Sequence, residues 1–167
     1  MSLGEEFKES FDVAGRRIGN GAGCFVIAEA GVAHFGNADM GRRLLELAIS
    51  AQADAFKLQV FDVETLFIES CEEWRTRLGS RVLDYSHLEE LRARCREAGL
   101  AFILTAHDES RISWLDSLDV DAVKVGSGER NNPGFLNRLA KLHRPMILST
   151  GMHNEADVVE SLKAVNE

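Results

Sequence analysis

Two lysines that interrupt apolar segments are the residues of this sequence best suited to binding an anion. Lys57 stands between Phe and Leu, and Lys124 stands between two Val. A buried lysine is rare unless a negative group pairs with it. The preceding residues also match, because Asp54-Ala-Phe-Lys and Asp121-Ala-Val-Lys share one pattern. We interpret the pair as a cationic cradle for phosphate or carboxylate; lysines that reach solvent or pair with acids are the alternative.

Polar groups able to bind an anion or move a proton follow each of five apolar segments. In chain order they are Glu29 and His34, then Gln59, then Thr105, His107 and Asp108, then Ser127 and Glu129, and finally Ser149 and Thr150. In parallel α/β folds the C-terminal ends of the strands share one face, so these groups would converge there.

The acids and histidines of this set each have a second interpretation. Glu29 is a candidate general acid or base, or else the carboxylate partner of a lysine. His34 and His107 are either site residues or solvated loop histidines. No H-x-x-x-H or H-E-x-x-H metal pattern is present.

The Gly126-Ser127-Gly128 segment predicts a flexible turn whose backbone amides could approach an anion, or else a plain turn. The G-x-G-x-x-G fingerprint is absent after the first strand, which disfavours dinucleotide binding. A lysine in a buried strand could instead form a Schiff base with a carbonyl substrate, so an aldolase mechanism stays open.

Short apolar segments alternate with helical ones, which is the pattern of βα units. We predict strands at 25–28, 55–60, 101–104, 122–125 and 146–148, a hairpin over 11–19 that turns at Ala14-Gly15, and a helical insertion over 64–78. The first long helix should bury Met40, Leu44, Leu47 and Ala51 on one face.

Five βα units fit either a complete doubly wound sheet or the first five units of an eight-stranded barrel. Length alone favours the open sheet, because a whole barrel needs about 250 residues and this chain has 167. A net charge of −8 argues against nucleic acid and anionic membranes as partners. The sequence shows no membrane span or secretory signal, so we expect a cytoplasmic protein.

Ordered motifs resemble those of the sialic acid synthases, a family that includes the spore coat polysaccharide synthases. Residues 27–36 read I-A-E-A-G-V-A-H-F-G and resemble the family's A-E-I-G-x-N-H-x-G, while 54–59 read D-A-F-K-L-Q and resemble D-x-x-K-x-Q. Later segments follow in the family order: L-D-Y at 83–85, the 105–108 turn, K-V-G-S-G-E at 124–129 and S-T-G-M at 149–152. Ala30 and Ala33 depart from the first motif, which leaves the acceptor sugar open.

The resemblance implies a TIM-type (β/α) barrel, an α/β fold, of which this chain holds the first five βα units. The expected domains are an N-terminal lead and hairpin over 1–20 and a partial barrel over 21–167. The implied reaction joins phosphoenolpyruvate to an N-acetylmannosamine-like aldehyde, giving a sialic-acid-type product for surface polysaccharide. The resemblance also implies a transferase that acts as a homodimer and needs manganese or magnesium, whose ligands lie outside this chain.

The resemblance assigns site residues as well. Glu29 and Glu129 would flank the reacting centre as catalytic residues, and Gln59 would meet sugar hydroxyls. The residues expected on the phosphate and carboxylate of phosphoenolpyruvate are Lys57, Thr105, Lys124, Ser127 and Ser149. We expect the 167 residues alone to be inactive. Two alternatives stay open: a non-catalytic half-barrel that binds a phosphorylated metabolite or assembles as a subunit, and a Schiff-base aldolase.

Overall fold

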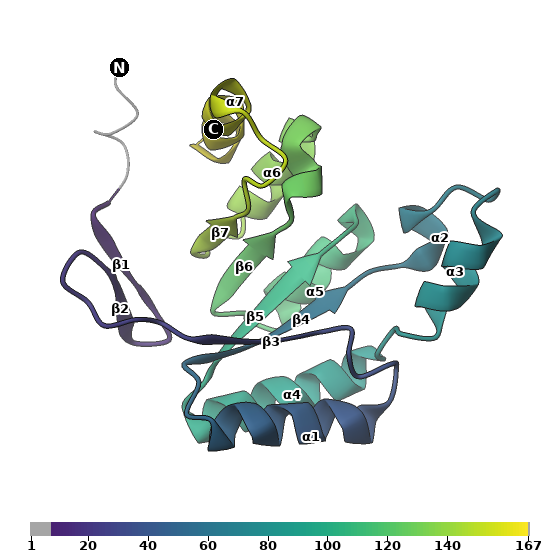
Figure 1. The fold of residues 1–167 in the computed structure, drawn as a ribbon, viewed down its shortest axis with the longest axis horizontal. Coiled ribbons are helices and arrows are strands. Elements are labelled where there is room, and N and C mark those ends of the chain that lie inside the picture. Colours follow the sequence, from purple (N-terminus) through teal and green to yellow (C-terminus); the bar gives the residue numbers. More distant parts are fainter. Residues whose placement is uncertain (1–7, 167) are drawn as a thin grey trace.

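The computed structural model describes residues 8–166. Its central sheet has five parallel strands that neighbour one another in chain order, β3-β4-β5-β6-β7 (Figure 1). The strands are β3 (Ile27–Gly31), β4 (Ala55–Val60), β5 (Ala101–Ala106), β6 (Ala122–Val125) and β7 (Met146–Leu148). A doubly wound sheet would reverse its strand order at a switch point, whereas a barrel adds each strand beside the last. The order therefore indicates the barrel.

At least one helix follows each of these five strands, and most of the helices cover the outer side of the sheet, while the first two after β4 project beyond the end of that strand (Figure 1). They are α1 (Ala38–Ser50), α2 (Val63–Leu66), α3 (Glu72–Gly79), α4 (Tyr85–Ala98), η2 (Glu109–Arg111), α5 (Ile112–Ser117), η3 (Ser127–Asn131), α6 (Pro133–Ala140) and α7 (Glu155–Asn166). Outward strand residues such as Phe56, Phe102 and Leu104 pack with helix residues such as Leu45 and Leu91 in one buried cluster. None of the described helices has the length and apolar composition that a membrane span requires.

The inner side of the sheet changes character along the strands. At their N-terminal ends Ala55, Ala101, Ile103 and Ala122 form a second apolar cluster with Val13. Side chains alternate across a strand, so the next inward positions lie nearer the C-terminal ends. Those positions carry the polar groups described below.

The predicted hairpin is confirmed as β1 (Ser10–Val13) and β2 (Arg16–Gly19), paired antiparallel. Ala14 and Gly15 form its turn, and both have positive φ, 49° and 78°. A two-residue turn with that geometry matches the twist of the strands it joins. Because its Val13 packs into the inner cluster, the hairpin covers the inner side of the sheet at the N-terminal ends of the strands, which we call the lower end. The boundary between residues 20 and 21 stays a prediction, and residues 1–7 of the predicted lead lie outside the described residues.

Three strands match their predicted bounds, and two differ. β5 extends two residues further than predicted, to Ala106, and β3 begins two residues later, at Ile27. The delay has a cause in the register, because Ile27 pairs with Ala55, the first residue of β4. Nothing on β4 continues the ladder before that pair. The backbone N–H of Val26 instead donates to the side chain of Asp54, at 2.6 Å.

The predicted inward face of the first helix is confirmed only at Leu44, which is partly buried against the core, and is wrong at Met40, Leu47 and Ala51. α1 buries Gly41, Leu45 and Ala48, whereas Met40 and Leu47 are exposed, Leu47 by 63%. β3 is an edge strand of the sheet, so among the described residues no neighbouring unit covers this flank of α1. The segment over 64–78 folds as two helices, α2 and α3, which confirms the helical insertion.

Candidate anion-binding site

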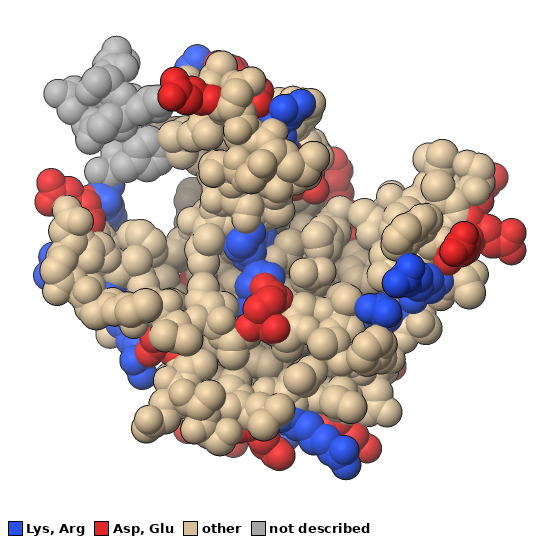
Figure 2. Space-filling model, viewed as in Figure 1, with Lys and Arg blue, Asp and Glu red and all other residues tan. Residues whose placement is uncertain are grey.

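Lys57 and Glu29 form an ion pair on the inner side of the sheet. Their strands place them directly opposite each other in register, and Lys57 Nζ donates to Glu29 Oε2 at 2.5 Å. Lys57 is 4% exposed, while the carboxylate remains half exposed. Figure 2 shows basic and acidic side chains adjoining at the centre of the viewed face, where Figure 1 places the strands. The acid of β3 and the lysine of β4 are therefore ion-pair partners.

Lys124 lies in the same electrostatic environment but has neutral partners. Its Nζ donates to the backbone oxygen of Val125, at 2.6 Å, and to Ser149 Oγ. The pKa of Lys124 is lowered, first because burial disfavours the ammonium and then because Lys57 is nearby; Glu29 opposes the shift. The cluster thus holds two cations and one carboxylate, which is paired with Lys57, and this excess of positive charge favours the binding of an anion.

Thr105 lies on β5, between the two strands that carry the lysines, opposite Gln59 in the register. It is 3% exposed, and its Oγ1 has no hydrogen-bond partner. A buried polar atom left unpaired costs about 1–3 kcal/mol. Such exceptions call for an explanation, and a hydroxyl between two ammonium groups is explained by a ligand oxygen that it would serve.

A glycine keeps space open beside Glu29. Gly31 has φ of +54°, and a Cβ there would lie 3.2 Å from Glu29 Oε1 and 3.5 Å from Gln59 Nε2. The ladder between β3 and β4 shifts register at this point. The positive φ and the short distances both favour glycine, so Glu29 and Gln59 can approach each other across it.

His107 connects Gln59 to a neighbouring cavity, which Glu129 also lines. Gln59 Oε1 lies 3.2 Å from His107 Nε2, and His107 lines a cavity of about 530 Å³ together with Glu129. Glu129 Oε2 accepts a hydrogen bond from Asn132 Nδ2 at 3.0 Å. Glu129 therefore faces this adjoining cavity, while Glu29 faces the lysines.

Asp108, which the sequence placed after the third strand, fixes the rim of that cavity. Its Oδ2 accepts from the backbone N–H of Asp62 at 2.7 Å, and its Oδ1 accepts from the N–H of Ser110 at 2.9 Å. The carboxylate thereby ties the loop after β4 to the loop after β5. Ser127, at the start of η3, has its Oγ 3.9 Å from the position that a Cβ on Gly151 would take, so it adjoins the loop after β7. The predicted flexible turn at 126–128 is instead the start of η3: Gly126 is its N-cap, and Ser127 and Gly128 are its first two residues.

His34 is neither solvated nor part of the lysine cluster's hydrogen bonds. It is 1% exposed; its Nδ1 accepts from the N–H of Gly36 at 3.1 Å, and its Nε2 has no hydrogen-bond partner. Burial lowers the pKa of His34 to about 4, so the ring is neutral at neutral pH. The solvated alternative is wrong for His34, because its ring is buried and Nδ1 accepts from the backbone of the same loop.

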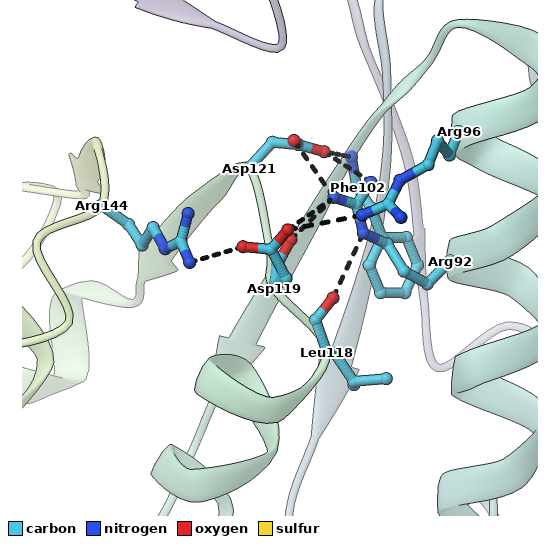
Figure 3. A network of polar contacts seen from close by, with 7 residues as sticks. All are labelled: Arg92, Arg96, Phe102, Leu118, Asp119, Asp121 and Arg144. Atoms are coloured by element: carbon cyan, nitrogen blue, oxygen red, sulfur yellow. Dashed lines mark hydrogen bonds and ion pairs between the residues drawn. The ribbon is translucent and has the colours of Figure 1, made fainter.

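The aspartates of the two matching motifs act at the opposite end of the strands. Asp121 Oδ2 accepts from the N–H of Phe102, the second residue of β5, at 2.7 Å, and pairs with Arg92 at 2.9 Å (Figure 3). Asp54 accepts from Val26 in the same way and pairs with Arg16. Sequence reasoning noticed the repeat but missed this role. Its signal was the aspartate directly before each apolar strand.

Among residues 8–166 the structure shows no group of three or more His, Cys, Asp and Glu side chains that could hold a metal ion. The lysine cluster combines two lysines, hydroxyls and an amide with the single carboxylate of Glu29, and this excess of hydrogen-bond donors suits an anion better than a cation.

A family model described as the NeuB family matches residues 44–167. The chain belongs to this family. N-acetylneuraminate-9-phosphate synthase of Mus musculus is 35% identical in an alignment 152 positions long, which covers 84% of this chain and 42% of the relative. Spore coat polysaccharide biosynthesis protein SpsE of Bacillus subtilis is 31% identical in an alignment 166 positions long, which covers 93% of this chain and 44% of the relative. The predicted resemblance is confirmed, and this NeuB-family chain spans less than half the length of these relatives.

The solved structures confirm the fold. N-acetylneuraminic acid synthetase from Leptospira borgpetersenii superposes with a TM-score of 0.88 at 24% identity, over 94% of this chain and 55% of that one. The strand order and this partial coverage agree with a TIM-type barrel of which five βα units are present.

Proposed function

We propose that the full-length protein is a nonulosonic acid synthase that condenses phosphoenolpyruvate with an open-chain amino-sugar aldehyde. The NeuB-family relatives include sialic acid synthases, which supports this class of product. The observation that carries the proposal is the lysine cluster, where Glu29 pairs with Lys57, Lys124 has only neutral hydrogen-bond partners, and the hydroxyl of Thr105 is unpaired. Such a cluster fits a small molecule with several anionic oxygens.

The phosphate and carboxylate of phosphoenolpyruvate would bind among Lys57, Lys124, Thr105 and Ser149, with Ser127 adding a hydroxyl from η3. Ser149 already accepts from Lys124 Nζ, so its own hydroxyl hydrogen is free to turn toward a ligand oxygen. Positioned donors stabilise the negative charge of the substrate and of the departing phosphate. Holding both reactants in one orientation supplies further acceleration.

The reaction forms one carbon–carbon bond, and at C2 a bond to the oxygen of water replaces the bond to the phosphate oxygen, with the new C2 hydroxyl losing its proton as the ketone forms. C3 of the enol attacks the aldehyde carbon, whose oxygen takes a proton, and water adds at C2. The resulting intermediate releases phosphate by cleavage of its C2–O bond. Glu29, which is half exposed beside Lys57, would exchange a proton with the water that adds at C2.

The acceptor would occupy the side of the site that Gln59 and Glu129 face. Gln59 offers an amide for sugar hydroxyls, and Glu129 offers a carboxylate in the adjoining cavity. A divalent ion would act as Lewis acid on the aldehyde, held by residues beyond the 167 of this chain. Homodimer formation and a cytoplasmic location stay predictions.

Phosphate release by the full-length protein, with phosphoenolpyruvate, N-acetylmannosamine and manganese, tests the proposal. We expect release only when the sugar is present, and ¹⁸O placed in the C2–O bridge should leave with the phosphate. Lys124→Ala should reduce kcat/KM for phosphoenolpyruvate by about a hundredfold or more, because a charge-assisted contact to a dianion is lost. Lys163→Ala is the matched control, since Lys163 pairs with Glu160 on the surface of α7.

Three outcomes would contradict the proposal. Wild-type kinetics for Lys124→Ala would show that the two lysines do not form the binding site for phosphoenolpyruvate. Borohydride trapping of a carbonyl substrate on Lys57 or Lys124 would favour the Schiff-base aldolase. Binding of phosphoenolpyruvate without turnover of any aldehyde sugar would favour the non-catalytic half-barrel.

A further inference from the structure

His107 occupies the next inward position after Thr105, just beyond the end of β5. Its Nε2 lies 3.2 Å from Gln59 Oε1. An amide oxygen can only accept, so His107 Nε2 carries the hydrogen and donates it. The neutral ring then keeps a lone pair on Nδ1, which makes His107 a hydrogen-bond acceptor toward a ligand.

The groups around His107 hold it in this neutral form. Lys57 on β4 and Lys124 on β6 face it, as does Asp108 from its own loop. The pKa of His107 is lowered by burial first and then by the two lysines, against the opposing effect of Asp108. Phe61 meets the ring edge-on, with centroids 6.4 Å apart and planes at 64°, so the ring is also fixed in orientation.

The same contact orients Gln59. Because Oε1 turns toward His107, Nε2 is the atom that faces Gly31, where a Cβ would lie 3.5 Å away. Glu29 Oε1 would lie 3.2 Å from that same position. Gln59 therefore presents its donor on the Glu29 side, at the centre of the site, and its acceptor to the imidazole.

The cavity beyond His107 combines acceptors with apolar walls. Besides the imidazole it is lined by two apolar side chains, Leu66 and Phe135, and by six polar residues, Thr65, Asp108, Glu109, Ser110, Glu129 and Asn132. Glu129 brings a carboxylate and His107 a neutral lone pair, both of which favour a neutral N–H or O–H donor and disfavour a second anion. Leu66 and Phe135 add surfaces suited to a methyl group.

We propose that His107 is a substrate-contacting and specificity-determining residue, and that this cavity receives the acylamino substituent of the acceptor sugar. An acylamino group carries one N–H donor and one apolar end, which matches the two kinds of wall. The assignment rests on the proposed synthase function and goes further by naming the substituent that the site selects. Gln59 is positioned by the same imidazole, so one residue would set both the acceptor's orientation and its selection.

The test compares N-acetylmannosamine with mannose as acceptors for the full-length wild-type protein and for His107→Phe. Phenylalanine preserves the aromatic packing on Phe61 but removes both ring nitrogens. We expect KM for N-acetylmannosamine to rise about tenfold, as for one lost hydrogen bond in a dry site. KM for mannose should rise less than KM for N-acetylmannosamine, because mannose is affected only through the orientation of Gln59, and KM for phosphoenolpyruvate should change by less than about twofold.

Two further variants separate this role from a structural one. His107→Gln retains a donor toward Gln59 while it lacks Nδ1, so it should lose discrimination between the two sugars yet keep the wild-type unfolding temperature. His87→Phe on α4 is the control and should match the wild type in both respects. An unchanged ratio of kcat/KM for the two sugars in His107→Phe and His107→Gln would overturn this assignment alone. A wild-type protein that turns over neither sugar would overturn the proposed function together with it.

Discussion

The two ends of the same strands differ in how their charges are satisfied. At the N-terminal end, Asp54 and Asp121 each accept a backbone N–H and pair with an arginine. At the C-terminal end, Lys124 has neutral partners and Thr105 Oγ1 has none. In barrels of this type the lower end serves stability and the upper end serves chemistry. The repeated Asp-Ala-x-Lys motif therefore supplies a stabilising aspartate at the start of each of two strands and a ligand-binding lysine further along the same strand.

The spacing of the motif explains the division. Each aspartate precedes its lysine by three residues, and a strand rises about 3.3 Å per residue, so the two charges stand about 10 Å apart. The aspartate can therefore accept a hydrogen bond from the backbone of the neighbouring segment without neutralising the lysine. Removing groups at the lower end should cost stability, whereas removing groups at the upper end should cost ligand binding.

The largest effect on stability is expected from Arg92→Leu. Arg92 is buried and donates to Asp121, to the backbone oxygens of Leu118 and Asp119, and it stands close to the Asp119 carboxylate (Figure 3). Its loss leaves a largely buried carboxylate without its cation, which should lower the free energy of unfolding by about 4 kcal/mol. Chemical denaturation measures this.

Arg94→Leu is the matched control on the same helix, because Arg94 makes an exposed pair with Glu46. It should change the free energy of unfolding by less than about 1 kcal/mol. An equal loss of unfolding free energy in the two variants would mean that the Arg92–Asp121 pair contributes no more to stability than an exposed ion pair. Phosphoenolpyruvate affinity should be preserved in whatever fraction of Arg92→Leu is folded.

His34 should make stability depend on pH at the upper end. Its pKa is lowered from 6.5 to about 4 by burial, so the unfolded chain binds the proton more readily between those values. Stability is therefore full above about pH 6.5, falls as the pH drops toward 4, and loses about 3 kcal/mol from this group in total. Denaturation curves at several pH values measure the slope.

His34→Asn isolates this contribution, because the amide oxygen of Asn can still accept from the N–H of Gly36 while carrying no titrating group. The variant should lose the part of the slope between pH 4 and 6.5 that belongs to His34. Parallel curves for the wild type and the variant would show that the ring is not buried as described.

Thr105→Val sharpens the comparison by removing the unpaired hydroxyl without changing the shape of the side chain. We expect an equal or higher free energy of unfolding, since no hydrogen bond is broken, and an affinity for phosphoenolpyruvate about tenfold lower. Calorimetric titration gives the affinity. Thr76→Val on the exposed side of α3 serves as the control, and an unchanged affinity in Thr105→Val would remove this residue from the site.

The smallest expected effect is a pH dependence of binding. Because the pKa of Lys124 is lowered, its ammonium loses its proton at a lower pH than an ordinary lysine. Phosphoenolpyruvate affinity should therefore fall as the pH rises, starting below 10.5, the ordinary lysine value. Lys124→Arg stays charged throughout, so its affinity should vary less between pH 8 and 10. Identical pH profiles would place the titrating group elsewhere.

The sequence by itself determined the alternation of strands and helices, their order and the bounds of β4, β6 and β7. Those features depend on local periodicity and on short apolar segments, which are visible within a few residues. It also determined that Lys57 and Lys124 interrupt buried strands, because a charge inside an apolar run stands out without knowledge of its neighbours.

Only the tertiary structure decided which groups meet. The register of β3 against β4 pairs Glu29 with Lys57, and the loops after β5 and β6 bring His107 and Glu129 to one cavity. The uncovered flank of α1 likewise left Leu47 exposed against the helical pattern. The physical reason is that burial and contact depend on what lies across the sheet, and a local pattern carries no information about a partner tens of residues away.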